Sequence, residues 1–419
     1  MKVLVVGHGA REHAIAKKLA EEDVEIHAAM ARRNPGIAGL SKRMEIIDIS
    51  NPESYDRFKG VDIAFIGPEA PLAAGVTDHL NGMGIPVVGP TRDLARLEWS
   101  KAFTRSFLKE RGIGGNPEFS ICRNRADVRR FLIEHPDVAV KPDVLTGGKG
   151  VRITGEHLNS PADVEAYAAE RIGRDGLVIL EEKLIGREFT LQTFTDGDRV
   201  EVMPLVRDYK RALDGDRGPN TGSMGSFSCP DHGLPDLSGE AVRRGEEIMR
   251  RTVRELTRTE GRFRGVLYGG FMNTERGVFL LEYNVRFGDP EAINVLALME
   301  TPLLEVGWEI VEGRLRRPVF QGKATVCVYL VPSGYPTSPR SGTPVSIEPP
   351  RSSDLYYASV HEEDGVVYTT SSRSIALLAR GETVDEARER VYEDVPRIRG
   401  DLFYRRDIAE GVRARSFGG

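Results

Sequence analysis

Residues 278–291 read Val-Phe-Leu-Leu-Glu-Tyr-Asn-Val-Arg-Phe-Gly-Asp-Pro-Glu, an apolar run that leads directly into alternating polar residues. The alternation predicts a strand on which Glu282 and Asn284 share one face, because successive side chains of a strand point to opposite sides. A carboxylate and an amide oxygen on one face suit Mg²⁺ or Mn²⁺, which take oxygen ligands and leave room for substrate phosphates. The stretch therefore predicts a metal site that handles phosphates.

Two further features extend this site. Arg286 follows on the same face, where its planar guanidinium can bind a phosphate or a carboxylate. Gly288-Asp289-Pro290 is a turn signal that would end the strand beside the site. The simpler alternative is an exposed strand edge with solvated charges, but the apolar run indicates burial nearby, and buried charges need partners.

Composition excludes several classes of function. The chain has 419 residues, of which 40% are hydrophobic and 29% charged, as is typical of a globular protein of about two to four domains. A net charge of −5 leaves no basic surplus for nucleic acid, and no apolar stretch approaches the roughly eighteen residues of a membrane span. The first strand begins at Lys2 without room for a signal peptide, and the three cysteines lack metal-ligand spacing. We expect a cytoplasmic protein that binds neither nucleic acid nor membranes, as a monomer or a small homo-oligomer.

Residues 1–98 are predicted to form an α/β unit with a helix over Arg11–Ala20 that is amphipathic. Apolar strands are expected at Val3–Val6, near Ile26–Ala29 and Ile63–Ile66, and at Pro86–Val88. Strands that end in glycine-rich turns and continue into helices indicate a doubly wound parallel sheet, with ligands at the carboxyl ends of the strands.

The first turn, Gly7-His8-Gly9-Ala10-Arg11-Glu12, is close to a dinucleotide fingerprint, but Glu12 replaces its third glycine. The second strand lacks an acidic residue for an NAD ribose, although Arg32 and Arg33 leave NADP open. Arg11 at a helix start suits a small phosphorylated substrate better, because its charge adds to the backbone N–H donors. An ordinary structural turn is the remaining alternative.

A second glycine-rich element follows a short strand, Val138–Lys141, and contains Gly147-Gly148-Lys149-Gly150. It is not a Walker loop, because the spacing differs and no helix pattern follows. We interpret it as a hairpin that folds over phosphates, with Lys141 and Lys149 at its ends; a mobile surface hairpin is the alternative. The strand Leu177–Leu180 then enters residues 181–188, which can offer backbone groups to an adenine and Glu188 to a ribose, or can be a simple linker.

These elements, in this order, resemble the phosphoribosylamine–glycine ligase family (glycinamide ribonucleotide synthetases) of the ATP-grasp superfamily. The resemblance spans essentially the whole chain. Its motifs are Gly7-x-Gly9-x-Arg11-Glu12-His13, Gly67-Pro68-Glu69-Ala70-Pro71-Leu72, Ser100-Lys101-Ala102-Phe103, Gly147-Gly148-Lys149-Gly150, Lys210-Arg211, Gly218-Pro219-Asn220-Thr221-Gly222 and Asn284-x-Arg286-Phe287-Gly288-Asp289-Pro290-Glu291. The last two are the most specific, and they separate this family from biotin carboxylases and other ATP-grasp relatives.

The resemblance implies that glycine is joined to 5-phosphoribosylamine in de novo purine synthesis, with ATP converted to ADP and phosphate. Glycine carboxylate is a poor electrophile, so the family first phosphorylates it to glycyl phosphate, and the amine of the second substrate then displaces phosphate. Such chemistry depends on positioning and charge neutralisation, which agrees with the lack of a Ser/His/Asp or Cys/His constellation.

The resemblance also implies a role for each matching residue. The residues implied for ATP are Lys101, Lys141, Gly147, Gly148, Lys149, Gly150, Glu181, Glu182, Leu184 and Glu188. Those implied for the substrates are Gly9, Arg11, Glu12, Gly67, Pro68, Glu69 and Asp208. Those implied for catalysis are Arg286, Lys210, Asn220 and Asp289, and Glu282 with Asn284 would hold Mg²⁺ or Mn²⁺.

The implied architecture is multidomain α/β and α+β. We expect a substrate domain at 1–98, an ATP-grasp core of two α+β subdomains at 99–120 with 190–322 and at 121–189 (the lid), and a small β-rich cap at 323–419. In the cap, strands are expected at Ala324–Val331, Tyr356–His361, Val366–Thr369 and Ile375–Ala379, with a helix from Thr383 to about Ile398. Lys210–Gly225 is an active-site loop by resemblance and a generic Ω-loop by composition.

Several positions depart from the family pattern. His8 and Ala10 replace the commoner residues of the N-terminal loop, a tolerable change because Gly7 and Gly9 remain. Val144 replaces a usual glycine, which would restrict the hairpin if a positive φ is needed there, and Tyr209 stands where many members have histidine. Gly270 lies on the strand before the metal motif, where some relatives offer a polar ligand. Two alternatives therefore stay open beside the glycine ligase: an ATP-grasp ligase for another acid or amine, and a nucleotide-binding protein that has lost turnover.

Overall fold

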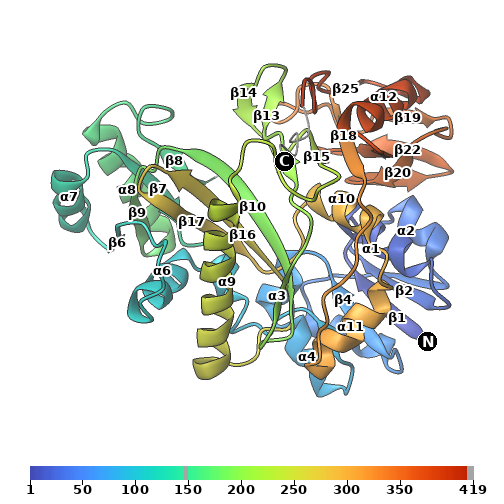
Figure 1. The fold of residues 1–419 in the computed structure, drawn as a ribbon, viewed down its shortest axis with the longest axis horizontal. Coiled ribbons are helices and arrows are strands. Elements are labelled where there is room, and N and C mark those ends of the chain that lie inside the picture. Colours follow the sequence, from blue (N-terminus) through green and yellow to red (C-terminus); the bar gives the residue numbers. More distant parts are fainter. Residues whose placement is uncertain (146–149, 413–419) are drawn as a thin grey trace, which may run out of the picture.

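The computed structural model describes residues 1–145 and 150–412. Its N-terminal part is a five-stranded, fully parallel sheet in the order β3-β2-β1-β4-β5, blue in Figure 1. The strands are β1 (Lys2–Val6), β2 (Glu25–Met30), β3 (Arg43–Ile46), β4 (Ile63–Ile66) and β5 (Val87–Val88). The predicted doubly wound sheet is confirmed. Strand β3 was not predicted, because its sequence Arg-Met-Glu-Ile has no apolar run and none of its residues is buried.

Helix α1 (Ala10–Leu19) differs from its prediction. It packs between its own sheet, α2 (Pro35–Leu40), α10 (Glu291–Leu298) and β20 (Asp354–Tyr357). Arg11, Glu12, His13 and Lys18 are therefore buried together with the apolar residues of the helix. The predicted helix is present, but it lacks the solvated face that an amphipathic pattern usually implies, because later parts of the chain cover the side that a lone α/β unit would expose. The other helices of this part are α3 (Glu69–Ala74), α4 (Val76–Gly82) and the 3₁₀ helix η1 (Pro52–Phe58).

The predicted pair of α+β subdomains is confirmed as two antiparallel sheets. One has the order β11-β10-β16-β17, with β10 (Arg187–Thr195), β11 (Val200–Val202), β16 (Gly265–Thr274) and β17 (Gly277–Asn284). Helix α9 (Gly239–Thr259) packs on it through residues spaced three or four apart, from Ala241 to Leu256.

The second antiparallel sheet has the order β6-β9-β7-β8, with β6 (Phe119–Cys122), β7 (Val138–Pro142), β8 (Arg152–Ile153) and β9 (Val178–Glu182). Helices α7 (Arg125–Glu134) and α8 (Pro161–Asp175) accompany it (Figure 1).

Short helices join these units. They are α5 (Arg96–Trp99), α6 (Lys101–Glu110), α10 and α11 (Leu303–Glu312). Within the described residues, none of the helices has the length and apolar character that a membrane span needs.

The C-terminal part is β-rich, as predicted. A six-stranded sheet has the order β12-β15-β18-β23-β20, with β25 also paired to β18, and a second sheet has the order β21-β22-β19-β24. The strands are β12 (Arg207–Asp208), β15 (Gly225–Ser228), β18 (Ala324–Pro332), β19 (Pro344–Ile347), β20, β21 (Val360–Glu363), β22 (Val366–Thr369), β23 (Ile375–Gly381), β24 (Ile398–Arg399) and β25 (Leu402–Phe403). Helix α12 (Val384–Asp394) continues into the 3₁₀ helix η2 (Val395–Arg397).

Two predictions for this region are corrected. The single strand expected over Tyr356–His361 is wrong. The segment contains two strands, β20 and β21, which are separated by two non-strand residues and belong to different sheets. The segment expected as a loop over Lys210–Gly225 contains a two-stranded hairpin, β13 (Arg211–Leu213) with β14 (Arg217–Asn220). Strands β12 and β15 flank this hairpin and pair with each other, so the segment starts and ends on the C-terminal sheet.

Candidate active site

Strand β17 carries the predicted metal residues on one face. Glu282 is exposed and Asn284 half-buried, whereas Tyr283 between them is buried. A bulge comes just before them, because Phe271 pairs with Leu280 and Gly270 pairs with Glu282, which leaves Leu281 as the extra residue. Within the described part of the chain, the Glu282 carboxylate accepts no hydrogen bond and forms no ion pair.

This donor set fits a hard divalent cation. Asn284 Oδ1 accepts one long hydrogen bond, 3.4 Å from Arg286 Nη2. Gly270 lies directly across from Glu282, and a Cβ at that position would be 3.6 Å from Glu282 Cγ. Among the described residues, no cluster of three or more His, Cys, Asp or Glu side chains could hold a metal. Two protein oxygens therefore suit a cation that keeps water and phosphate ligands, such as Mg²⁺.

Arg286 connects this strand to two carboxylates. Its Nη2 lies 3.0 Å from Glu98 Oε1, and its Nε lies 3.5 Å from Glu69 Oε2. Burial by itself would raise the pKa of Glu69, but the guanidinium groups of Arg286 and Arg11 hold that pKa below its usual value. Burial raises the pKa of Glu98 despite the opposing attraction of Arg286. Glu69, a predicted substrate residue, and Arg286, a predicted catalytic residue, thus meet across the two parts of the fold.

Glu98 was missed by the sequence analysis. Its carboxylate also accepts the N–H of Val285 at 2.8 Å, so it fixes both the backbone and the side chain at the end of β17. It stands in the short helix α5, where nothing in the local pattern distinguishes it from a surface glutamate.

The N-terminal turn is built around Glu12. Its carboxylate accepts the N–H of Gly9 at 2.6 Å and Arg11 Nε at 2.7 Å. A Cβ at Gly7, where φ is +119°, would lie 2.5 Å from Glu12 Cγ, and one at Gly67 would lie 2.1 Å from Glu12 Oε1. The side chain that replaces the third glycine of a dinucleotide fingerprint therefore fills the space under the turn.

Arg11 then extends from this turn to the segment that follows β17. Its Nη1 donates to the carbonyl of Phe287 at 3.0 Å, next to Arg286. Pro68 precedes α3 and Glu69 begins it, so the second predicted substrate motif lies at a helix start. The structure brings the two N-terminal motifs and the Arg286 motif together.

The predicted ATP residues of β7 and β9 lie in a buried ion-pair cluster. Lys141 Nζ is 2.8 Å from Glu181 Oε2 and donates to the carbonyl of Leu281 at 3.0 Å. Arg105 pairs with both oxygens of Glu181, at 2.7 and 2.9 Å, and donates to the same carbonyl at 2.7 Å. Burial lowers the pKa of Lys141, whereas Arg105 and Lys141 outweigh burial and hold the pKa of Glu181 below its usual value. The cluster thus holds Lys141 against the carbonyl of Leu281, the residue that precedes Glu282 in the chain.

Arg105 is the second residue that the sequence analysis missed. It stands on α6, and its partners lie 76 and 176 residues further along the chain. A single sequence carries no signal for such distant pairs.

The remaining predicted ATP residues are more loosely arranged. Gly147, Gly148 and Lys149 lie outside the described residues, while the carbonyl of Gly150 accepts a hydrogen bond from Tyr167 at 2.7 Å. Lys101 begins α6, Glu182 ends β9 and pairs with Arg276 at 2.5 Å, and Leu184 is half-buried between β9 and β10. The backbone at Val144 does not have a positive φ, so the expected restriction by its side chain does not arise.

Lys210 and the buried Glu291 belong to a second group of charged residues near Asp208. Lys210 Nζ is 2.7 Å from Glu188 Oε2. Burial acts to lower the pKa of Lys210, but the carboxylates of Asp208, Glu188 and Glu282 raise it above its usual value. Burial and the charge of Asp208 raise the pKa of Glu291 to about 7. Asp208, Lys210 and Glu282 are thus near enough to influence one another.

The other two predicted catalytic residues are less directly placed. Asn220 is exposed at the end of β14. Asp289 is bound by Arg373 at 2.9 Å and by the Tyr329 hydroxyl, both from the C-terminal part. Asp289 therefore has partners already, whereas Asn220 makes no side-chain hydrogen bond within the described residues.

Comparison with known proteins identifies the family. Three family models match in sequence: phosphoribosylglycinamide synthetase N domain over residues 1–98, its ATP-grasp (A) domain over 99–292 and its C domain over 325–411. The phosphoribosylamine–glycine ligase of Methanoregula boonei is 46% identical over 415 residues, covering 97% of this chain and 96% of the relative. That of Methanothermobacter thermautotrophicus is 45% identical over 419 residues, with the same coverage of each chain.

A solved structure agrees with this result. The crystal structure of the phosphoribosylamine–glycine ligase from Thermotoga maritima superposes with a TM-score of 0.83 at 29% identity, and the match covers 97% of this chain and 100% of that one. ATP-grasp ligases use ATP together with a divalent metal ion. The chain therefore belongs to the phosphoribosylglycinamide synthetase family, whose ATP-grasp enzymes join glycine to 5-phosphoribosylamine in purine biosynthesis.

Proposed function

We propose that this chain carries out that ligation in two steps at the face of β17. The carboxylate of glycine attacks the terminal phosphorus of ATP, which gives glycyl phosphate and ADP. The amine of 5-phosphoribosylamine then attacks the acyl carbon, an amide bond forms, and the bond to phosphate breaks. The observation that carries the proposal is the position of Arg286, which pairs with Glu69 of the N-terminal part and lies beside Asn284 of the metal strand.

Glu282 and Asn284 would hold Mg²⁺ or Mn²⁺, because their oxygens share one face and the Glu282 carboxylate has no competing partner among the described residues. When bound, the cation would neutralise negative charge on the phosphoryl group during its transfer. Lys141 is fixed by Glu181 and by the Leu281 carbonyl, so its ammonium is held near the same phosphates. Lys101, Lys149 with its neighbouring glycines, and the segment Glu181–Glu188 complete the proposed ATP site.

The phosphoribosylamine side is proposed at the two N-terminal motifs. Gly9, Arg11 and the turn from Gly67 to Glu69 lie where the first and fourth strands end, as expected for a ligand of a parallel sheet. Glu12 supports the turn from below and would act through it. Arg286 would bind the acyl phosphate, where its fork adds charge and orientation.

The glycine side is proposed at Asp208 of β12, Lys210, Asn220 of β14 and Asp289, which is bound by Arg373 of the C-terminal part. Lys210 carries the charge expected for a carboxylate or a phosphate, and the neighbouring carboxylates raise its pKa further above its usual value. Asp289 would act mainly by fixing the turn after β17.

An ADP-release assay tests the proposal. Purified protein with Mg²⁺ and ATP should release ADP only when both glycine and freshly generated 5-phosphoribosylamine are present. ADP release that requires a different acid or amine would instead show that the chain is another ATP-grasp ligase. ATP binding without turnover under any of these conditions would overturn the enzymatic proposal altogether.

The organisation of the chain is part of the proposal. We infer a substrate domain at 1–98, a core at 99–120 with 190–322, a lid at 121–189 and a cap at 323–419. All three cysteines are buried. We propose that the enzyme is cytoplasmic, and fractionation of cells that express it tests this. A monomer or a small homo-oligomer is expected, and light scattering on the purified protein tests this.

A further inference from the structure

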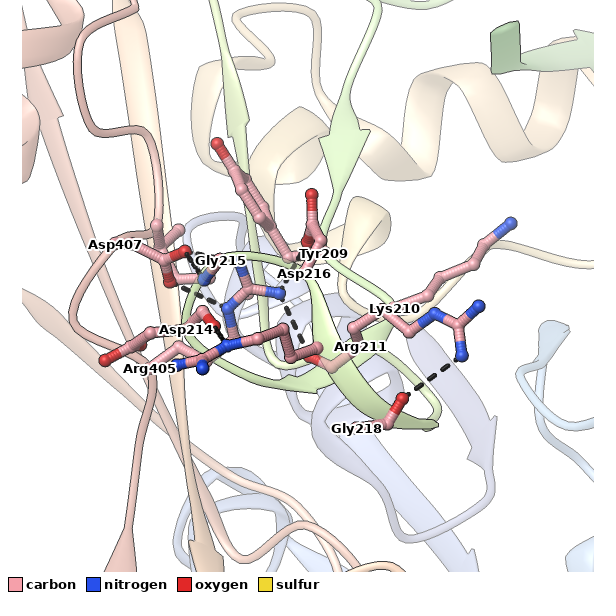
Figure 2. A network of polar contacts seen from close by, with 12 residues as sticks. Tyr209, Lys210, Arg211, Asp214, Gly215, Asp216, Gly218, Arg405 and Asp407 are labelled. Carbon is pink, nitrogen blue, oxygen red and sulfur yellow. Dashed lines mark hydrogen bonds and ion pairs between the residues drawn. The ribbon is translucent and has the colours of Figure 1, made fainter. Parts of the chain in front are cut away.

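The hairpin that carries Lys210 and Asn220 is held from the C-terminal end of the chain (Figure 2). Arg405, with 1% of its side chain exposed, binds both carboxylate oxygens of Asp407 at 2.7 and 2.6 Å. The same guanidinium donates to Asp216 Oδ1 at 2.7 Å and to the carbonyl of Arg211 at 3.0 Å. One buried arginine thus binds the tip of the hairpin and its first strand together.

Neighbouring contacts fix the backbone of the hairpin. Asp407 also accepts the N–H of Gly215 at 2.8 Å, and Asp214 accepts the N–H of Arg406 at 2.8 Å. Asp216 itself has a φ of +53°, a conformation that a non-glycine residue rarely keeps without support. The carboxylate that Arg405 binds belongs to this residue, so the arginine stabilises an unfavourable turn.

Tyr209, which precedes Lys210, is also held by the C-terminal segment. The hydroxyl of Tyr209 accepts the N–H of Ala409 at 3.0 Å, and the guanidinium of Arg405 lies 4.9 Å from the centre of the Tyr209 ring. Figure 2 shows Tyr209 and Arg405 close together, while the Lys210 side chain extends away from this network. The anchored residues on both sides of Lys210 therefore determine the direction in which its side chain leaves the backbone.

On its other side the hairpin meets the ATP-grasp sheets. Lys210 Nζ pairs with Glu188 at the start of β10, and Arg211 Nη2 lies 3.5 Å from Glu156 beyond β8. The backbone of Arg211 is bound by Arg405, whereas its side chain extends to Glu156. The hairpin thus bridges the C-terminal segment and the region of the proposed ATP site.

We propose that Arg405 is a positioning residue of the ligase reaction, which acts by holding the hairpin so that the ammonium of Lys210 faces the reacting groups; this rests on the proposed function. In this role Arg405 would act through Lys210 and would not contact the substrates itself. A lysine cannot replace it fully, because one ammonium cannot make the forked contact with Asp407 and reach Asp216 and the Arg211 carbonyl as well. The contribution of the C-terminal part to catalysis would then be geometric.

The test compares three variants. Arg405→Gln removes the fork, Arg405→Lys keeps the charge, and Arg406→Gln is the matched control. Arg406 is exposed, and its side chain makes no hydrogen bond or ion pair within the described residues. Amide hydrogen exchange over residues 210–221 reports the hairpin, and steady-state kinetics give kcat and the KM for each substrate.

We expect Arg405→Gln to speed exchange of the hairpin amides by about tenfold or more, because several charge-assisted hydrogen bonds are lost together. We also expect its kcat to fall by at least about tenfold. The KM for ATP should change less than kcat does, because the Lys141 cluster is untouched and only the Lys210–Glu188 contact joins the hairpin to the proposed ATP residues. Arg405→Lys should lie between Arg405→Gln and the wild type, and Arg406→Gln should match the wild type in both measurements.

Other outcomes overturn the inference. Wild-type exchange in Arg405→Gln would show that the arginine does not hold the hairpin. Faster exchange with wild-type kcat per folded molecule would show a structural role alone. If Arg405→Gln does not fold, Asp407→Asn replaces it, and the same two outcomes apply. Failure of the proposed function is separate, because the wild-type enzyme would then release no ADP with glycine and 5-phosphoribosylamine, whatever the exchange data show.

Discussion

Glu291 should make the stability of this protein depend on pH in an unusual direction. It begins α10 with 3% of its surface exposed, and the hydroxyl of Tyr268 donates to its Oε1 at 3.0 Å. Burial is the main reason for its raised pKa, and the negative charge of Asp208 adds to it. The folded protein therefore favours the protonated carboxyl, which accepts from Tyr268 without placing a second charge beside Asp208.

The magnitude follows from the shift. The pKa rises from 4.5 to about 7 on folding. Between these values the folded state binds more protons than the unfolded state, so the free energy of unfolding falls as pH rises through this window. Each pKa unit corresponds to about 1.4 kcal/mol, so Glu291 should cost about 3 kcal/mol above pH 7 relative to pH 4.5 or below.

Glu291→Gln tests this directly, because the amide imitates the protonated carboxyl. Urea unfolding of the wild type and the variant at pH 5, 6, 7 and 8 gives the difference in free energy of unfolding at each pH. We expect the two proteins to be nearly equal at pH 5 and the variant to be more stable by about 3 kcal/mol at pH 8. Comparison at each pH cancels the titration of all other groups.

Glu300→Gln serves as the control, since Glu300 is exposed and its side chain has no partner within the described residues. Its difference from the wild type should be the same at every pH. A variant at position 291 that kept the wild-type pH dependence, or that was less stable than the wild type at pH 8, would refute the argument. Such a result would mean that the carboxylate is charged in the folded protein and is stabilised there.

Three further substitutions test separate parts of the structure. Glu282→Ala should abolish ADP release with little change in the thermal unfolding midpoint, because the side chain is exposed; an unchanged kcat would refute its metal role. Glu181→Ala should lower the free energy of unfolding by about 3–5 kcal/mol, since it leaves Arg105 buried without its carboxylate, and a loss under about 1 kcal/mol in urea would contradict this. Gly36→Ala would place a methyl group 2.1 Å from Cε1 of the His13 ring and should cost about 1–3 kcal/mol by the same measurement; wild-type stability would show that this contact relaxes freely.

The sequence predicted those features that depend on local patterns. Strand β17 was predicted with Glu282 and Asn284, the two proposed metal ligands, on one face, because alternation with a period of two is visible in a single chain. The parallel N-terminal sheet was predicted from apolar runs that end in glycine-rich turns. The bulge at Leu281 was not visible, yet the prediction survived, because both metal residues lie on the same side of it.

The sequence did not predict features that depend on distant partners. Arg105 and Glu98 support the site through Glu181 and Arg286, and their local sequence does not distinguish them from surface charges. Arg405 stands 189 residues from Asp216, in a segment that had no predicted role. The solvated face that an amphipathic pattern usually implies is missing from α1 for the same reason, since the elements that cover it come much later in the chain.

The two carboxylates around Arg286 differ in a way that matters for binding. The Glu98 side chain is 7% exposed and lies 3.0 Å from the guanidinium, whereas that of Glu69 is 34% exposed and lies 3.5 Å away. A short, buried ion pair is costly to break, while a longer and more solvated one is weaker. If Arg286 binds the acyl phosphate as proposed, the phosphate would displace Glu69 from the guanidinium while Glu98 keeps its place. Glu98 thus holds Arg286 from its buried side. The opposite side of the guanidinium, toward the N-terminal turn, would then bind the phosphate where the proposed substrates would meet.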